Sequence, residues 1–163
     1  MTKLNIRGAT DSDRDAIWNI FREVIADGDT YPFDREMSRE DALAYWYQPA
    51  ARVYVAEEGG HILGSYLLRP NQSGGGAHVA NAAFIVAASA RGKGIGRTMG
   101  EHCLKEARRL GFQAIQFNFV VVTNESAVRL WQNLGMKIIG TLPGAFQHPT
   151  KGCVDVYVMF QSF

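Results

Sequence analysis

A glycine-rich stretch in the middle of the chain has the residue types that hold phosphates. It reads Arg91-Gly92-Lys93-Gly94-Ile95-Gly96 and lies between an apolar segment, residues 78–87, and an amphipathic segment that ends at Gly111. Small residues between a strand and a helix let backbone N–H groups approach an anion, and the N-terminus of the helix adds positive potential. The stretch therefore predicts a phosphate-bearing ligand without identifying it.

Two well-known phosphate-binding motifs do not fit this stretch. A P-loop requires Ser or Thr directly after Gly-Lys, whereas Gly92-Lys93 is followed by Gly94. A dinucleotide-binding G-x-G-x-x-G motif would need glycine at the position of Met99. The strand expected after the helix also ends at Thr123 without the acidic residue that would bind a ribose. These departures exclude a P-loop and disfavour a nicotinamide site.

The elements that would position the stretch follow from polarity patterns along the chain. Alternating polarity predicts strands, and apolar residues at intervals of three and four predict helices. The predicted strands span residues 4–7, 52–57, 61–68, 78–87, 114–122, 137–142 and 153–161, and the predicted helices span 14–27, 39–47, 97–110 and 125–134. The fold class is therefore α/β, a mixed sheet in the order β-α-α-β-β-β-α-β-α-β-β, and 163 residues are typical of one domain covering residues 1–163.

The composition narrows the kinds of partner. A net charge of +1 without clustered Lys and Arg gives no field for nucleic acid, and no apolar run approaches the roughly 18 residues of a membrane span. The start of the chain has no signal-like apolar segment, so we expect a cytoplasmic protein. Cys103 and Cys153 are too few for a metal site, and we expect both to be small buried hydrophobic residues. A small-molecule partner and no metal fit this composition.

The pattern Arg-x-x-Gly-x-Gly, followed by a helix, an apolar strand and Asn-x-x-Ala, resembles the GCN5-related N-acetyltransferase (GNAT) superfamily. Residues 90–97 are similar to its pyrophosphate loop, and residues 124–136 are similar to its second cofactor segment. The element order matches as well, so the resemblance covers nearly the whole chain. The length and layout are most similar to phosphinothricin acetyltransferases. Segments around Thr30, Asn81 and His148 are also similar to a branch that acetylates azetidine-2-carboxylate.

The resemblance implies acetyl-CoA as the cofactor and CoA as a product. The cofactor would lie in a V-shaped gap between the strands at residues 78–87 and 114–122, which splay apart in this fold. The backbone of residues 84–86 would run beside the pantetheine arm, and the amides of residues 92–96 would hold the pyrophosphate. The implied cofactor-binding residues are Phe84, Ile85, Val86, Arg91, Gly92, Lys93, Gly94, Ile95, Gly96, Arg97, Asn118, Asn124, Ser126 and Trp131.

The chemistry of N-acetyl transfer assigns candidate roles to three residues. An N–H group of Val86 or a neighbour could stabilise the carbonyl oxygen during attack. The resemblance implies a Tyr that protonates the departing thiolate, but Trp131 occupies that position, and an indole N–H can only hydrogen-bond a thiolate. Asn81 replaces the Glu of phosphinothricin acetyltransferases and cannot act as a base, so an ordered water is the expected base. The candidate acceptor-binding residues are Thr30, Tyr31, Asn81 and His148.

We expect direct transfer of acetyl from acetyl-CoA to a primary or secondary amine of a small molecule, an amino acid or its analogue, in a ternary complex. No Cys–His pair in the sequence indicates a covalent intermediate. Two alternatives stay open: a peptide or protein N-acetyltransferase, and a non-catalytic acyl-CoA-binding sensor. The alternating last strand could also support a homodimer through an exposed edge.

Overall fold

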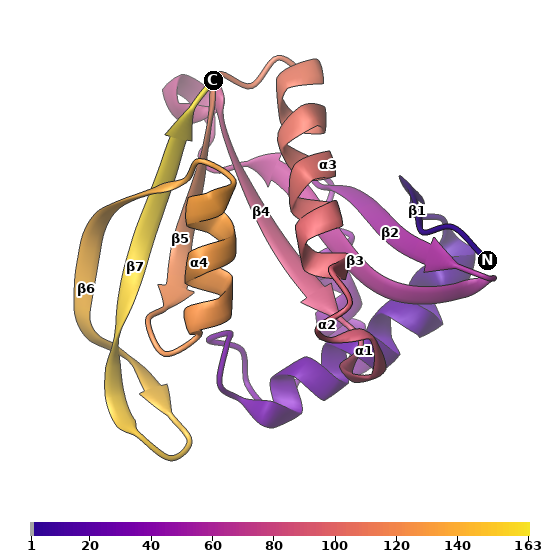
Figure 1. Ribbon diagram of the computed structural model, residues 1–163, viewed down its shortest axis with the longest axis horizontal. Coiled ribbons are helices and arrows are strands. Elements are labelled where there is room, and N and C mark those ends of the chain that lie inside the picture. Colours follow the sequence, from indigo (N-terminus) through magenta and orange to yellow (C-terminus); the bar gives the residue numbers. More distant parts are fainter. Residues whose placement is uncertain (1) are drawn as a thin grey trace.

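Seven strands form one mixed sheet in the order β1-β2-β3-β4-β5-β7-β6 in the computed structural model, which describes residues 2–163 (Figure 1). The strands are β1 (Asn5–Gly8), β2 (Arg52–Glu58), β3 (His61–Pro70), β4 (Val79–Val86), β5 (Ala114–Val121), β6 (Lys137–His148) and β7 (Gly152–Ser162). All neighbouring strands are antiparallel except β4 and β5, which are parallel. The predicted mixed α/β sheet and its order of strands and helices are confirmed.

The helices cover both faces of this sheet. They are α1 (Arg14–Asp27), α2 (Arg39–Trp46), α3 (Ile95–Arg109) and α4 (Glu125–Asn133). Two adjacent residues of β3 identify the faces, because neighbouring residues of a strand point in opposite directions. The Ser65 hydroxyl accepts a hydrogen bond from Trp46 of α2 at 2.9 Å, whereas a Cβ on Gly64 would lie 2.9 Å from Met99 of α3. Figure 1 accordingly shows α3 and α4 on one side of the sheet and α1 and α2 on the other.

The sheet opens between its two parallel strands. β4 and β5 are paired only at Val79–Ala114 and Ala80–Ile115, and beyond these residues they diverge (Figure 1). The Asn81 side chain spans the start of the opening, where its amide nitrogen donates to the carbonyl of Gln116 at 2.9 Å. The predicted splayed strand pair is therefore confirmed.

Local sequence explains where the helices begin and end. The Ser38 hydroxyl accepts a hydrogen bond from the backbone N–H of Asp41 at 3.1 Å, which caps the N-terminus of α2 as its sequence predicts. Gly28 ends α1 in the left-handed conformation, with φ of 64°. None of the helices described between residues 2 and 163 is long and apolar enough to cross a lipid bilayer. The start of α2 and the end of α1 are thus encoded locally, and the loop between these two helices reaches the opening in the sheet.

The C-terminal hairpin differs from the sequence expectation in three ways. β6 continues past the predicted end at residue 142 through Pro143, which an edge strand tolerates because its missing N–H would face solvent. β7 lies between β5 and β6, so the expectation that the last strand offers an exposed edge is wrong, and the free edge belongs to β6. Cys103 is buried as expected, but Cys153 is exposed because it is the second residue of β7, next to the turn that joins β6 and β7.

Candidate active site

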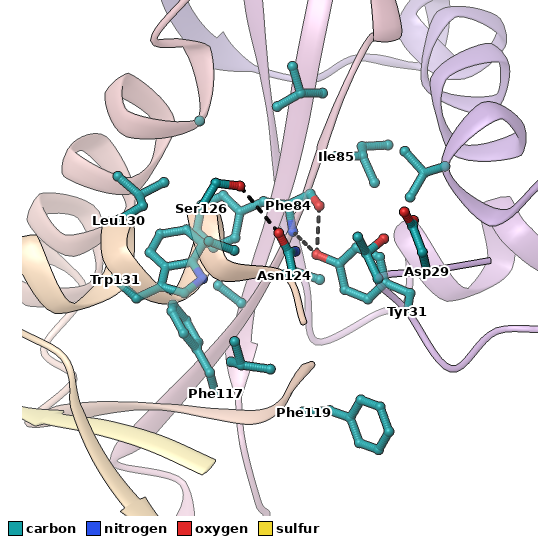
Figure 2. Close-up of a pocket in the computed structure, with 18 of the residues that line it drawn as sticks. Asp29, Tyr31, Phe84, Ile85, Phe117, Phe119, Asn124, Ser126, Leu130 and Trp131 are labelled. Atoms are coloured by element: carbon teal, nitrogen blue, oxygen red, sulfur yellow. Dashed lines mark hydrogen bonds between the residues drawn. The ribbon is translucent and has the colours of Figure 1, made fainter. Parts of the chain in front are cut away.

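A cavity of about 690 Å³ opens where β4 and β5 diverge. Its walls come from these two strands, the N-terminus of α3, one face of α4 and the loop after α1 (Figure 2). The cavity brings together sixteen of the predicted site residues: Thr30, Tyr31, Asn81, Phe84, Ile85, Val86, Arg91, Gly92, Gly94, Ile95, Gly96, Arg97, Asn118, Asn124, Ser126 and Trp131. Segments that are far apart in the sequence thus meet at the opening in the sheet.

Two predicted site residues do not line this cavity. Lys93 is exposed at the tip of the glycine-rich turn. His148 lies at the end of β6, where its Nδ1 accepts hydrogen bonds from the backbone N–H groups of Thr150 at 3.1 Å and Lys151 at 3.2 Å. The ring of Phe146 lies 6.5 Å from that of His148, on the side toward the cavity residue Phe119. His148 therefore shapes the hairpin turn rather than the cavity.

The glycine-rich stretch forms a tight turn that leads directly into α3. Gly92 and Gly94 have φ of 75° and 79°, in the left-handed region that other residues rarely adopt. No side chain caps the helix, and no acidic residue occupies its first turn. The first N–H groups of α3 have no partner within the helix, and the residues that carry them line one end of the cavity. An anion-binding site requires this arrangement.

The two arginines that flank this turn are exposed and paired with carboxylates. Arg91 lies 3.0 Å from Asp27 at the end of α1, and Arg97 lies 3.0 Å from Glu101 one turn along α3. Pairs as exposed as these are weak and readily rearranged. The arginine side chains can therefore turn toward an anion at the start of α3.

The edge of β4 that faces the opening carries backbone groups that are not paired with a neighbouring strand. In an antiparallel pair, alternate residues exchange hydrogen bonds with the neighbouring strand. The N–H of Ala87 donates to the Leu63 carbonyl of β3, so the odd-numbered residues of β4 bond to β3. The N–H and C=O groups of Phe84 and Val86 consequently point to the opposite edge, where β5 has moved away. This edge can bind an extended ligand as a further strand would.

The Tyr31 hydroxyl is hydrogen-bonded to part of this open edge of β4. It donates a hydrogen bond to the Phe84 carbonyl at 2.6 Å and accepts one from the Phe84 N–H at 2.9 Å (Figure 2). Burial raises the pKa of Tyr31 to about 12, so the hydroxyl keeps the proton that it donates. The sequence predicted Tyr31 near an acceptor molecule, but its contact with the backbone of β4, 53 residues away, was not foreseeable from local patterns.

The opposite wall of the cavity is aromatic. The Trp131 ring of α4 lies 4.7 Å from the ring of Phe84 and 4.8 Å from that of Phe117, and only 9% of the residue is exposed. Asn124 stands at the start of α4, and its side chain does not cap the helix. It accepts a hydrogen bond from the Ser126 hydroxyl at 3.4 Å instead and lines the cavity.

Amide side chains join three strands at the narrow end of the opening. Asn81 is buried, and its bond to Gln116 leaves its Oδ1 and its second N–H for other partners. Asn118 of β5 donates to the Asn71 side chain just after β3, at 2.7 Å. Arg69 of β3 lies directly opposite Asn81 and also lines the cavity, although no local sequence pattern indicates this position. Predicting Arg69 would have required the register of β3 against β4.

The arrangement suits a long ligand with a phosphate group at one end. The start of α3 can bind the phosphate, the edge of β4 can bind amide groups, and the narrow end can bind a second, smaller molecule. Across residues 2–163, no group of three or more His, Cys, Asp or Glu side chains could hold a metal ion. The site therefore provides hydrogen bonds and shape through its own backbone and side chains.

Comparisons with known proteins agree with this geometry. The family model for the acetyltransferase (GNAT) family matches residues 17–136. A GCN5-related N-acetyltransferase from Kribbella flavida is 48% identical, with a TM-score of 0.94 over 98% of both chains. N-acetyltransferase aca1 from Schizosaccharomyces pombe is 31% identical over 80% of this chain and 71% of its own length.

A more distant structure shares the fold. The phosphinothricin acetyltransferase from Sinorhizobium meliloti, solved in complex with acetyl-CoA, is 19% identical, with a TM-score of 0.86 over 98% of this chain and 88% of that one. The family model covers most of the sequence, and two relatives exceed 30% identity. The chain therefore belongs to the acetyltransferase (GNAT) family and is an acetyl-CoA-dependent acyltransferase.

Proposed function

We propose that the protein transfers the acetyl group of acetyl-CoA directly to a primary or secondary amine of a small molecule, an amino acid or its analogue. The observation that carries this proposal is the edge of β4 that is not paired with β5, which runs through the cavity from the glycine-rich turn to the narrow end. Acetyl donor and acceptor would meet in one ternary complex. In this reaction an N–C bond forms, the thioester C–S bond breaks, and the amine proton is lost as CoA leaves.

The residues around the cavity are suited to hold acetyl-CoA along its length. We assign the pyrophosphate to the backbone N–H groups of residues 92–96, with Arg91 and Arg97 turning toward it. The pantetheine arm would lie along Phe84 and Val86, with Asn124, Ser126 and Trp131 on the other side. The N–H of Phe84 or Val86 would then stabilise the negative charge that develops on the acetyl oxygen.

The acceptor must lose a proton to react. An alkylamine with a pKa near ~10 is only about one part in a thousand neutral at pH 7. Asn81 cannot accept this proton, but its free Oδ1 can accept a hydrogen bond from the amine and orient it. We propose that water carries the proton away, and that the thiolate of CoA leaves without a protein acid, because thiols ionise near ~8.5.

Calorimetric titration with acetyl-CoA tests the proposed phosphate site. Gly94→Trp should abolish binding, because the new side chain would fill the turn and strain a backbone with φ of 79°. Gly60→Trp is a matched control, because Gly60 has φ of 81° and equally open surroundings in the β2–β3 turn. Acetyl-CoA binding that survives Gly94→Trp would contradict the assignment.

Thiol release from acetyl-CoA tests the acceptor. The panel should contain proline analogues, phosphinothricin-like amino acids, polyamines and short peptides, and we expect release with the amino acids. Release with peptides but not with free amines would instead identify a peptide N-acetyltransferase. Binding of acetyl-CoA without release in any reaction would identify a sensor.

We also propose that two copies associate through β6. This strand is the free edge of the sheet on the C-terminal side, and Ile138, Ile139 and Leu142 are 37%, 58% and 41% exposed on it. Large apolar side chains along an open edge favour pairing with another chain. Light scattering of the purified protein should give twice the mass of one chain. Ile139→Lys should reduce the measured mass to that of one chain.

A further inference from the structure

One charged side chain in the cavity lacks the partner that its burial requires. The Nε of Arg69 is buried and has no hydrogen-bond partner among residues 2–163. Its guanidinium makes one long hydrogen bond, from Nη1 to the Gln48 side chain at 3.4 Å. Buried polar groups in native proteins nearly always have partners, and because Arg69 lines the cavity, a molecule bound there can supply the missing one.

The other arginines of the cavity differ from Arg69. Arg91 and Arg97 are exposed and each lies 3.0 Å from a carboxylate. Arg69 has no carboxylate within 4.0 Å in the part of the chain that the structure describes, although it is half-buried. Its positive charge is therefore not neutralised by the protein, and the ligand that completes it must be an anion.

The position of Arg69 identifies which ligand this anion belongs to. Arg69 is directly opposite Asn81 across β3 and β4, at the end of β4 away from the phosphate-binding turn. Arg69 and Asn81 point to the same face of the sheet because paired residues of neighbouring strands do so. Ser65 shares that face and bonds to Trp46 of α2, so this is the side covered by α1 and α2. The anion thus belongs to the acceptor rather than to the phosphates of acetyl-CoA.

We propose that Arg69 binds the carboxylate of the acceptor, which is therefore an α-amino or imino acid rather than a simple amine. This inference rests on the proposed function. The planar guanidinium presents paired N–H groups that match the two oxygens of a carboxylate. Asn81 Oδ1 receives the amine beside it, because paired residues lie only about 5 Å apart. Neighbouring amine and carboxylate groups are the defining feature of an α-amino acid.

The test compares acceptors in which a neutral amide replaces the carboxylate. Thiol release from acetyl-CoA is measured with proline and prolinamide, and with methionine and methioninamide. We expect kcat/KM for each amino acid to exceed that for its amide by about 10- to 100-fold, the range of a charged hydrogen-bonded pair. Arg69→Gln should remove this preference by lowering kcat/KM for the amino acids alone, and Arg69→Lys should restore part of it.

Two controls separate recognition from folding. Arg69→Gln should retain the affinity for acetyl-CoA and the melting temperature, which a disrupted fold would lower. Arg52→Gln changes an exposed arginine of β2 outside the cavity and should leave the preference for amino acids intact. Equal kcat/KM for acid and amide, or an unchanged preference in Arg69→Gln, would overturn the inference while leaving the acetyltransferase function in place.

A failure of the proposed acetyltransferase function would give a different experimental result from a failure of the Arg69 inference. In that case no amine or amino acid would release thiol from acetyl-CoA. The role of Arg69 would then be judged by calorimetric titration of proline and methionine into the CoA-bound protein. Binding that is lost in Arg69→Gln would support the carboxylate site, and no binding of either amino acid to the wild-type protein would overturn it.

Discussion

The Tyr31 hydroxyl is hydrogen-bonded to the backbone groups of Phe84 that acetyl-CoA would use. The effect of removing this hydroxyl on stability and on affinity can therefore be calculated. Tyr31→Phe deletes the hydrogen bonds of 2.6 and 2.9 Å to Phe84. Each is worth about 0.5–1.5 kcal/mol, and water in a cavity of about 690 Å³ can solvate the freed groups. We therefore expect the free energy of unfolding to fall by about 1–2 kcal/mol.

The loss of these two hydrogen bonds should favour the binding of acetyl-CoA. If the acetyl-CoA thioester takes the place of the hydroxyl, the wild-type protein must break both bonds before it binds, whereas Tyr31→Phe has none to break. A difference of about 1–2 kcal/mol tightens binding about 5- to 30-fold. The variant should thus be less stable than the wild type and yet bind acetyl-CoA more tightly.

Calorimetric titration with acetyl-CoA and chemical denaturation measure these two effects. Tyr47→Phe is the matched control, because the Tyr47 hydroxyl donates to the Thr10 carbonyl at 3.1 Å away from the cavity. It should lower stability slightly and leave the affinity unchanged. Weaker or unchanged acetyl-CoA binding in Tyr31→Phe would refute the reasoning, because the hydroxyl would then contact the ligand or lie outside its path.

Two further predictions concern the packing and electrostatics of α3. Gly100→Ala places a Cβ 2.7 Å from Leu134, so overpacking of α3 against α4 should lower the free energy of unfolding by about 1–3 kcal/mol in denaturation experiments. Gly140→Ala is the control, because its open surroundings should make the loss small. Hydrogen bonds from Arg109 and Tyr54 lower the pKa of Glu106 from 4.5 to about 2, so Glu106→Gln should lose about 1–2 kcal/mol of stability at pH 7. Because the folded pKa is depressed, this difference should shrink as the pH falls from about 4.5 toward 2, and a constant difference would contradict it.

Some expectations from the sequence depend on contacts between distant segments, and the structure differs from these expectations. The ring of Phe146 separates His148 from the cavity residue Phe119. β7 was expected at an edge but lies inside the sheet. Polarity patterns reveal that a strand exists and which residues alternate along it. They do not reveal which strands become its neighbours, because that depends on the packing of both faces.

The glycine-rich turn and the order of the elements were determined by the sequence alone. Glycines with positive φ followed by a helix form a local motif, whose geometry depends on adjacent residues. Only the tertiary structure decided what surrounds the acceptor end of the cavity. Tyr31 meets Phe84 across 53 residues, and Arg69 meets Asn81 through the register of two strands. Such contacts arise from the packing of distant segments, so the glycine-rich turn was predictable from the sequence, whereas the partners of Tyr31 and Arg69 were not.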